Sequence, residues 1–221
     1  MIEDSPKPSY PRKQARQQRS RLLMRSVRDA AIELIRRDGA ESLTASSIAE
    51  HAGVGIGSFY QYYPNAEAVL TDIYEHILDE LNAEILERLE KQGGGFDLSF
   101  EDSMLNGLEV TLSLHRKLLA VHPSFYASFI NQFNITDARG PDGRNWDTWA
   151  VDWLAAILEK HRHRLRHEDT AFVAQLIVDV VSGAVHRFAT TRSQHLDDPR
   201  VKRELFDLIC RYILAECVVQ D

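Results

Sequence analysis

Hydroxyl and amide side chains gather in one short stretch of the chain, between residues 44 and 62. Its polar members are Thr44, Ser46, Ser47, Ser58, Tyr60, Gln61 and Tyr62. Hydroxyl groups near a helix N-terminus can hold phosphates, and the amide of Gln61 can both donate to and accept from an adenine edge. Ile56 offers an apolar contact for a thymine methyl group, and Gly57 lets the backbone approach base pairs closely. These residue types suit contact with double-stranded DNA.

Two short helices are expected to position these side chains. The apolar pattern predicts a helix over residues 45–52 with Thr44 as its N-cap, a break at Gly53, and a second helix over residues 55–63 that Pro64 ends. Two short helices joined at a glycine are typical of a helix-turn-helix, whose second helix enters the major groove. We expect Tyr63 to face the domain core instead.

The charge distribution along the chain is uneven. The formal net charge of −7 argues against a polyanionic partner, yet residues 1–28 carry +6 and residues 67–221 carry −10. Residues 1–18 contain three prolines and predict a flexible basic arm. We expect Arg12, Lys13 and Arg16 of this arm to reach an adjacent minor groove, whereas the alternative is a solvated basic tail.

The fold class follows from the spacing of apolar residues. Apolar positions recur every three to four residues almost throughout the 221-residue chain, which predicts about nine helices and an all-α fold. The predicted domains are the arm (1–18), a helix-turn-helix domain (19–65) and a helical domain (66–221). The longest apolar run, residues 173–185, is interrupted by Gln175 and Asp179, so we expect no membrane association and a cytoplasmic location.

The sequence gives little support for an enzyme or a metal-binding protein. No nucleophile elbow, metalloprotease helix or phosphate loop is present, and the glycines from Gly53 to Gly57 lack the sixth-position glycine and the preceding strand of a dinucleotide site. Cys210 and Cys217 are too few for a disulfide framework or zinc site. The run from His161 to His167 favours the solvated basic end of a helix over a metal site. We therefore expect no catalytic residue, metal or cofactor.

The sequence from Ile48 to Glu67 resembles the DNA-binding signature of the tetracycline-repressor (TetR) family. The spacing of Ala30-Ala31, Gly39 and Leu43-Thr44 also agrees, so the resemblance covers residues 20–70. Family members often carry a phosphate-binding lysine where this chain has Ala66, and many carry a hydroxyl residue where it has Gly55. The loss of one phosphate contact should reduce the steepness of the plot of log binding constant against log salt concentration by about 0.9 per subunit. The basic arm is expected to offset this loss.

The resemblance implies that the C-terminal helices form a homodimer and enclose a site for a small-molecule effector. Aromatic residues at helical spacing, a histidine in a leucine stripe and a polar stripe in an apolar helix are candidates to contact the effector: Phe125, Phe129, Phe133, Trp149, Trp153, His115, Gln175 and Asp179. Aromatic residues and a histidine at such positions are more often ordinary core residues, and the polar stripe, which includes Ser182 and His186, is more often a solvated face or a dimer seam than a pocket wall. Few buried cations are expected, which favours an apolar effector.

The last two predicted helices are apolar over more than one face, more than packing on their own domain requires. Pairing with a twofold copy would bury the remainder in a four-helix seam. The predicted seam residues are Val181, Ala184, Val185, Phe188, Leu205, Ile209, Tyr212 and Ile213. A dimer would place two recognition helices about 34–36 Å apart to contact a palindromic operator.

These observations predict a transcriptional regulator, namely a homodimeric repressor that a ligand releases from DNA. An activator using the same DNA-binding domain is one alternative. The other is a helical small-molecule-binding or interaction protein with weakened DNA binding, which Ala66 and the net negative charge make conceivable. That protein would bind DNA weakly and without sequence preference.

Overall fold

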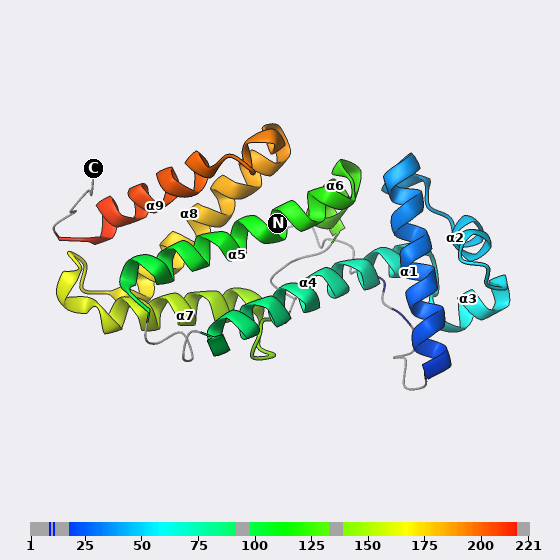
Figure 1. Cartoon of the computed structure of the whole chain (residues 1–221), viewed down its shortest axis with the longest axis horizontal. Coiled ribbons are helices and arrows are strands. Elements are labelled where there is room, and N and C mark those ends of the chain that lie inside the picture. Colours follow the sequence, from blue (N-terminus) through cyan, green and yellow to red (C-terminus); the bar gives the residue numbers. More distant parts are fainter. Residues whose placement is uncertain (1–8, 10, 12–17, 92–97, 133–138, 216–221) are drawn as a thin grey trace, which may run out of the picture. The chain divides into compact units, whose positions relative to one another are not determined.

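The structure, a computed structural model, describes residues 9, 11, 18–91, 98–132 and 139–215, with only the backbone for residues 129–132. These residues form nine α-helices and no β-strand, which confirms the predicted all-α fold (Figure 1). The helices are α1 (Gln18–Asp38), α2 (Ala45–His51), α3 (Ile56–Tyr62), α4 (Ala66–Lys91), α5 (Phe100–Val121), α6 (Pro123–Gln132), α7 (Trp146–Lys160), α8 (Thr170–Thr191) and α9 (Pro199–Ile213). Short 3₁₀ helices follow α1 (η1, Ala40–Ser42), α7 (η3, Arg162–Arg164) and α8 (η4, Ser193–His195).

The helix ends follow local sequence signals. Gly39 follows α1 and Gly53 follows α2, with φ angles of 86° and 66° that side-chain-bearing residues rarely adopt. Side chains of Thr44, Asn145, Asp169 and Asp198 accept backbone N–H groups at the N-termini of α2, α7, α8 and α9. These caps satisfy donors that have no partner inside the helix, and each lies where the sequence changes from turn residues to an apolar period.

The chain divides into two compact units, and α4 and α5 contribute to both. Unit 1 comprises residues 1–79 and 117–134, and unit 2 comprises residues 80–116 and 135–221. Within unit 1, the Tyr74 hydroxyl of α4 donates to the Phe125 carbonyl of α6 at 3.2 Å, and the Ala40 N–H donates to the Ser124 hydroxyl at 2.8 Å. The boundary predicted at residue 65 follows the end of a motif, whereas packing groups the first half of α4 and all of α6 with the N-terminal helices.

Unit 1 has its own apolar core. The core joins α1 to α2, α3 and α4 through side chains that are wholly inaccessible to solvent: Val27, Ala31, Ile35, Ile48, Phe59 and Ile73. Within this unit, α2 and α3 lie beside α1 (Figure 1). The α1 face that contains Ala30, Ala31 and Leu34 is buried, as its helical spacing predicts.

In unit 2, α8 packs against both α7 and α9 (Figure 1). An ionic network links α5 to the segment where the loop after α8 leads into α9. The Arg116 guanidinium donates to the Leu196 carbonyl through Nε at 3.0 Å and to Glu109 through Nη1 at 2.9 Å, and Lys202 of α9 also donates to Glu109 at 2.9 Å. Arg116 and Glu109 of α5 therefore hold the last part of the loop between α8 and α9 and the start of α9.

The basic segment after α7 is not simply solvated. The Arg166 Nε donates to the Leu214 carbonyl at 2.9 Å, and the His167 ring lies 3.0 Å from the Tyr212 carbonyl through Nε2. Arg164 pairs with Glu101 and lies over the Phe100 ring. Arg166 and His167 therefore satisfy carbonyls at the C-terminus of α9, while Arg162 and His163 are exposed to solvent, as the sequence predicts.

Helix α8 is long and apolar enough, by length and composition alone, to cross a membrane. The sequence expectation had treated Gln175 and Asp179 as interruptions of its apolar run. A helix in the core of a folded domain meets the same criterion, although only 28% of the apolar window of α8 is buried. Its exposed apolar residues are Phe172, Leu176 and Val180. The expectation of no membrane association stays a prediction.

Substitution of Gly53 and of Gly57 by alanine should have opposite effects on stability. A β-carbon at either position meets no atom within 4 Å, but only Gly53 has a positive φ. Gly53→Ala should lower the free energy of unfolding by about 1 kcal/mol, because an L-residue is strained there. Gly57→Ala, inside α3, should raise it by up to about 1 kcal/mol through helix propensity. Urea unfolding of both variants measures this difference, and equal effects would contradict the turn geometry.

The acid sensitivity of unit 2 should depend on His115. Burial, together with the neighbouring His186, lowers the pKa of His115 from 6.5 to about 4. Below pH 6.5 the unfolded chain binds a proton that the folded chain does not, so the free energy of unfolding falls as the pH falls towards 4. By pH 5 this costs about 2 kcal/mol. Denaturant unfolding at pH 7.5 and pH 5 should show a smaller loss for His115→Leu, and an unaltered loss for the exposed control His163→Leu.

Candidate nucleic-acid interface

The turn between α2 and α3 is held by backbone hydrogen bonds. Gly53 N–H donates to the Glu50 carbonyl at 3.1 Å, and Val54 N–H donates to the Ala49 carbonyl at 2.9 Å. This pair of bonds around a residue of positive φ is a Schellman motif, which ends α2 sharply. The predicted break at Gly53 is therefore confirmed, and its reason is the backbone conformation at that residue.

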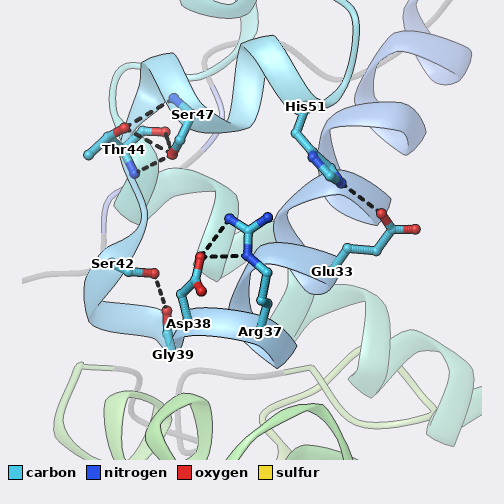
Figure 2. Close-up of polar contacts among 8 residues, drawn as sticks. All are labelled: Glu33, Arg37, Asp38, Gly39, Ser42, Thr44, Ser47 and His51. Carbon is cyan, nitrogen blue, oxygen red and sulfur yellow. Dashed lines mark hydrogen bonds and ion pairs between the residues drawn. The ribbon is translucent and has the colours of Figure 1, made fainter.

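Helix α2 begins in a reciprocal cap (Figure 2). The Thr44 hydroxyl oxygen accepts the Ser47 N–H, and the Ser47 hydroxyl oxygen accepts the Thr44 N–H, each at 3.1 Å. At the other end of α2, Nε2 of His51 lies 2.7 Å from a Glu33 carboxylate oxygen of α1. Of the three hydroxyl residues predicted to hold phosphate here, Thr44 and Ser47 take part in capping, and Ser46 is exposed at the same helix start.

Helix α3 has one buried and one exposed side. Phe59 and, just beyond the helix, Tyr63 are wholly buried, as expected for Tyr63. Ile56 and Tyr60 are 44% and 45% exposed, and Gly57 and Gln61 are exposed between them. Residues three and four positions apart lie on the same side of a helix, so Ile56 with Tyr60, and Gly57 with Tyr60 and Gln61, join into one exposed surface. This surface carries an apolar contact, a hydroxyl and an amide, the groups that contact base edges and phosphates.

Two further residues predicted to contact DNA have side chains that are partly buried against the rest of unit 1. Ser58 is half-buried, and so is Tyr62, whose hydroxyl lies 2.8 Å from the Ser20 hydroxyl of α1. Sequence reasoning gave Tyr62 a phosphate as its partner and overlooked Ser20, because nothing in the local pattern connects residues 42 positions apart. The contact ties the recognition helix to the start of α1.

The remaining DNA-contact predictions are of two kinds. Arg12, Lys13 and Arg16 lie outside the described residues. Gly55, one of the two departures from the TetR pattern, is the N-cap of α3 and supplies no side-chain cap. A hydroxyl there would accept a backbone N–H of α3, so this departure affects the stability of the recognition helix as well as its contacts.

Comparisons with known proteins agree with this geometry. Residues 27–73 match the family model described as "Bacterial regulatory proteins, tetR family", and residues 115–213 match the model "Tetracyclin repressor-like, C-terminal domain". Together the two models cover more than half of the chain. The chain belongs to the TetR family.

Particular relatives are similar in part of the sequence or in fold. A "Fatty acid metabolism regulator protein" of Bacillus subtilis (strain 168) is 32% identical over 92 residues, which is 42% of this chain and 43% of that protein. The structure of SmeT, the repressor of the Stenotrophomonas maltophilia multidrug efflux pump SmeDEF, has a TM-score of 0.60 at 19% identity, covering 89% of this chain and 93% of SmeT. The fatty acid degradation regulator FadR from Bacillus halodurans has a TM-score of 0.55 at 15% identity, covering 84% of this chain and 93% of FadR.

As a TetR-family member, the protein is a DNA-binding transcriptional regulator, and its family and fold matches are regulators rather than enzymes. Members of the family bind DNA operators and small-molecule effectors, and dimerisation is typical of them.

The predicted effector residues do not all lie in one unit. Phe125 is wholly buried in unit 1, where its ring centroid lies 4.4 Å from that of Tyr74. His115, Trp149 and Trp153 lie in unit 2. The two Trp rings are half-buried and stacked, with 6.4 Å between their ring centroids. The polar candidates of α8, Gln175 and Asp179, are exposed and bonded to each other at 3.1 Å. The Phe129 side chain and Phe133 lie outside the described residues. A solvated face or a subunit seam therefore suits the α8 pair better than a pocket wall within one chain.

Five of the eight residues predicted for the subunit seam of this TetR-family chain are buried within the chain itself. Val181, Val185, Leu205, Ile209 and Ile213 are at most 9% exposed, and Ala184, Phe188 and Tyr212 are half-buried. A side chain buried against its own chain has little surface left for a partner. The exposed large apolar residues are instead Phe172, Leu176 and Val180 of α8, spaced by four, and Leu208 of α9. This spacing is visible in the sequence, but periodicity alone does not show which of two apolar faces turns inward.

The contact between Tyr62 and Ser20 should contribute measurably to the stability of unit 1. Tyr62→Phe and Ser20→Ala should each lower the free energy of unfolding by about 1 kcal/mol, and the double variant by little more than either alone, because each removes the same hydrogen bond. Urea unfolding of the four-member cycle measures the coupling. Tyr60→Phe combined with Ser20→Ala is the control and should be additive, so an additive Tyr62 cycle would mean that the bond contributes nothing.

Proposed function

We propose that this regulator is a homodimeric repressor that binds a palindromic operator in the cytoplasm and is released by a small apolar effector. The exposed face of α3 is the observation that carries the proposal. Ile56, Gly57, Tyr60 and Gln61 share one surface on a helix held in a helix-turn-helix, and α3 is short enough to fit a major groove. The amide of Gln61 would contact an adenine edge, and the exposed Ser46 would contact a phosphate.

The apolar faces of α8 and α9 support the homodimer. Phe172 is 63% exposed and Leu208 is 55% exposed, with Leu176 and Val180 continuing the stripe on α8. Apolar side chains gathered on adjoining helices are costly in water and mark an interaction site. A twofold copy presents the same surface, so α8 and α9 of two subunits would bury both stripes together. Two copies of α3 would then contact the two halves of a palindrome.

The inner residues of unit 2 support an apolar effector. Trp149 and Trp153 are stacked and half-buried, and His115 is buried with a pKa lowered to about 4, so it is neutral at physiological pH. Aromatic walls with few buried charges favour apolar ligands. The partly similar Bacillus subtilis protein is named for fatty acid metabolism, which supports acyl chains as the first effectors to test. A ligand that binds better to a conformation unsuited to DNA lowers operator affinity by that difference.

A footprint of the purified protein on the DNA upstream of its own gene tests the proposal. We expect protection of a short palindrome that weakens as salt rises, because phosphate contacts release counterions. Gln61→Ala should reduce discrimination at one base pair in each half-site by about 1–3 kcal/mol, and Tyr60→Ala should abolish protection.

Gln194→Ala, which truncates an exposed glutamine of unit 2, is the matched control and should leave the footprint unchanged. Absence of protection upstream of the gene, followed by failure to select any sequence from genomic DNA, would contradict the proposal and favour the small-molecule-binding alternative. Protection of an operator whose promoter is then stimulated would assign activation instead of repression.

A further inference from the structure

Three helices of unit 1 meet at the carboxylate of Asp72. Asp72 lies on α4 and is 9% exposed. The Tyr63 hydroxyl, at the end of α3, donates to its Oδ2 at 2.8 Å, and Nη1 of Arg28, on α1, lies 3.6 Å from the same oxygen. No part of the predicted DNA-contact surface includes Asp72 or Arg28, so the proposed function leaves this buried ionic group without a role.

Tyr63 connects the carboxylate to the end of the recognition helix. Its backbone N–H donates to the Phe59 carbonyl at 2.9 Å as the C-cap of α3, and its side chain is wholly buried. Burial and the adjacent Asp72 raise the pKa of Tyr63, which keeps its hydroxyl protonated as a donor. The position of the last turn of α3 is therefore coupled to the position of one carboxylate on α4.

Arg28 adds α1 to the same point. Its side chain is only 19% exposed, so this residue of the basic N-terminal segment pairs inside unit 1 rather than facing solvent. Among the described residues its Nε has no hydrogen-bond partner. Burial raises the pKa of Asp72, but the Tyr63 hydroxyl and Arg28 both favour its charged form. Removing one partner leaves a buried group incompletely satisfied, which lets the remaining groups rearrange.

We propose that Asp72 is a positioning residue for DNA recognition, which sets the orientation of α3 by holding Tyr63 at its end and Arg28 of α1 on one carboxylate. The inference rests on the proposed function, in which α3 contacts base edges. Base-edge contacts need side chains placed within about 0.5 Å, whereas contacts to phosphates by flexible side chains tolerate small displacements. Loosening the end of α3 should therefore reduce sequence discrimination while leaving non-specific binding intact.

The test compares affinity for two DNA duplexes. The first carries the sequence that the wild-type protein selects from random DNA, and the second is a scrambled duplex of the same length and composition. For Tyr63→Phe we expect affinity for the selected duplex to fall roughly tenfold and affinity for the scrambled duplex to stay within about twofold. A merely destabilised protein has fewer active molecules, so it loses affinity for both duplexes by the same factor.

Tyr74→Phe is the matched control, since Tyr74 is also a buried tyrosine of unit 1, but its hydroxyl donates to Phe125 instead of to the carboxylate. Its ratio of affinities should equal that of the wild type. Asp72→Ala should lose discrimination and Asp72→Asn should regain part of it, because the amide oxygen of asparagine still accepts the Tyr63 hydroxyl. Circular dichroism and thermal unfolding establish that each variant is folded.

The outcomes separate this inference from the proposed function. If the wild type selects no sequence, the proposed function fails and this inference fails with it. If the wild type selects a sequence and folded Tyr63→Phe keeps the wild-type ratio, the positioning role of Asp72 is overturned while the proposed function stands. An equal loss by Tyr63→Phe and Tyr74→Phe also overturns it, because that result reflects general loosening of unit 1.

Discussion

The candidate interface depends on a helix too short to persist alone. Helix α3 has seven residues, and a helix of two turns in water does not repay the entropy of its first turn. Burial of Phe59 and Tyr63 supplies the missing stability, and the same burial turns Ile56, Tyr60 and Gln61 outward. The helical period thus places the anchoring residues on one side of α3 and the exposed residues on the other. The positive φ at Gly53 also contributes, because it sets the direction in which α3 leaves α2.

In unit 2 the corresponding constraint is that α8 carries two apolar faces, one buried within the chain and one exposed. Val173, Ile177, Val181 and Val185 are buried within the chain, while Phe172, Leu176 and Val180 lie exposed beside them. One face packs on neighbouring helices of the same chain, and the other is the face that the proposed homodimer would bury. The Arg116 network and the basic segment that binds the end of α9 hold the helices that carry these faces. A rigid exposed stripe is what a subunit contact requires.

Sequence reasoning succeeded where the determining contacts are local. The cap at Thr44, the turn at Gly53 and the all-α fold each follow from residues within about one helical turn. It did not show that five of the eight residues expected in the subunit seam are buried within the chain, or that Phe125 belongs to unit 1 whereas His115, Trp149 and Trp153 belong to unit 2. Apolar periodicity identifies a face but does not identify the surface that the face meets, because that surface comes from residues distant in the chain.

The sequence by itself determined the helical elements, the helix-turn-helix and the family to which it points, since these depend on backbone preferences and on spacing along one helix. Only the tertiary structure decided that Tyr62 contacts Ser20, that Arg28 and Tyr63 share the Asp72 carboxylate, and that Phe172 rather than Val185 faces outward on α8. Each of these depends on which side chains share a limited buried volume. Neighbours across 9 to 44 positions of sequence are brought together by packing, and no local preference encodes their meeting.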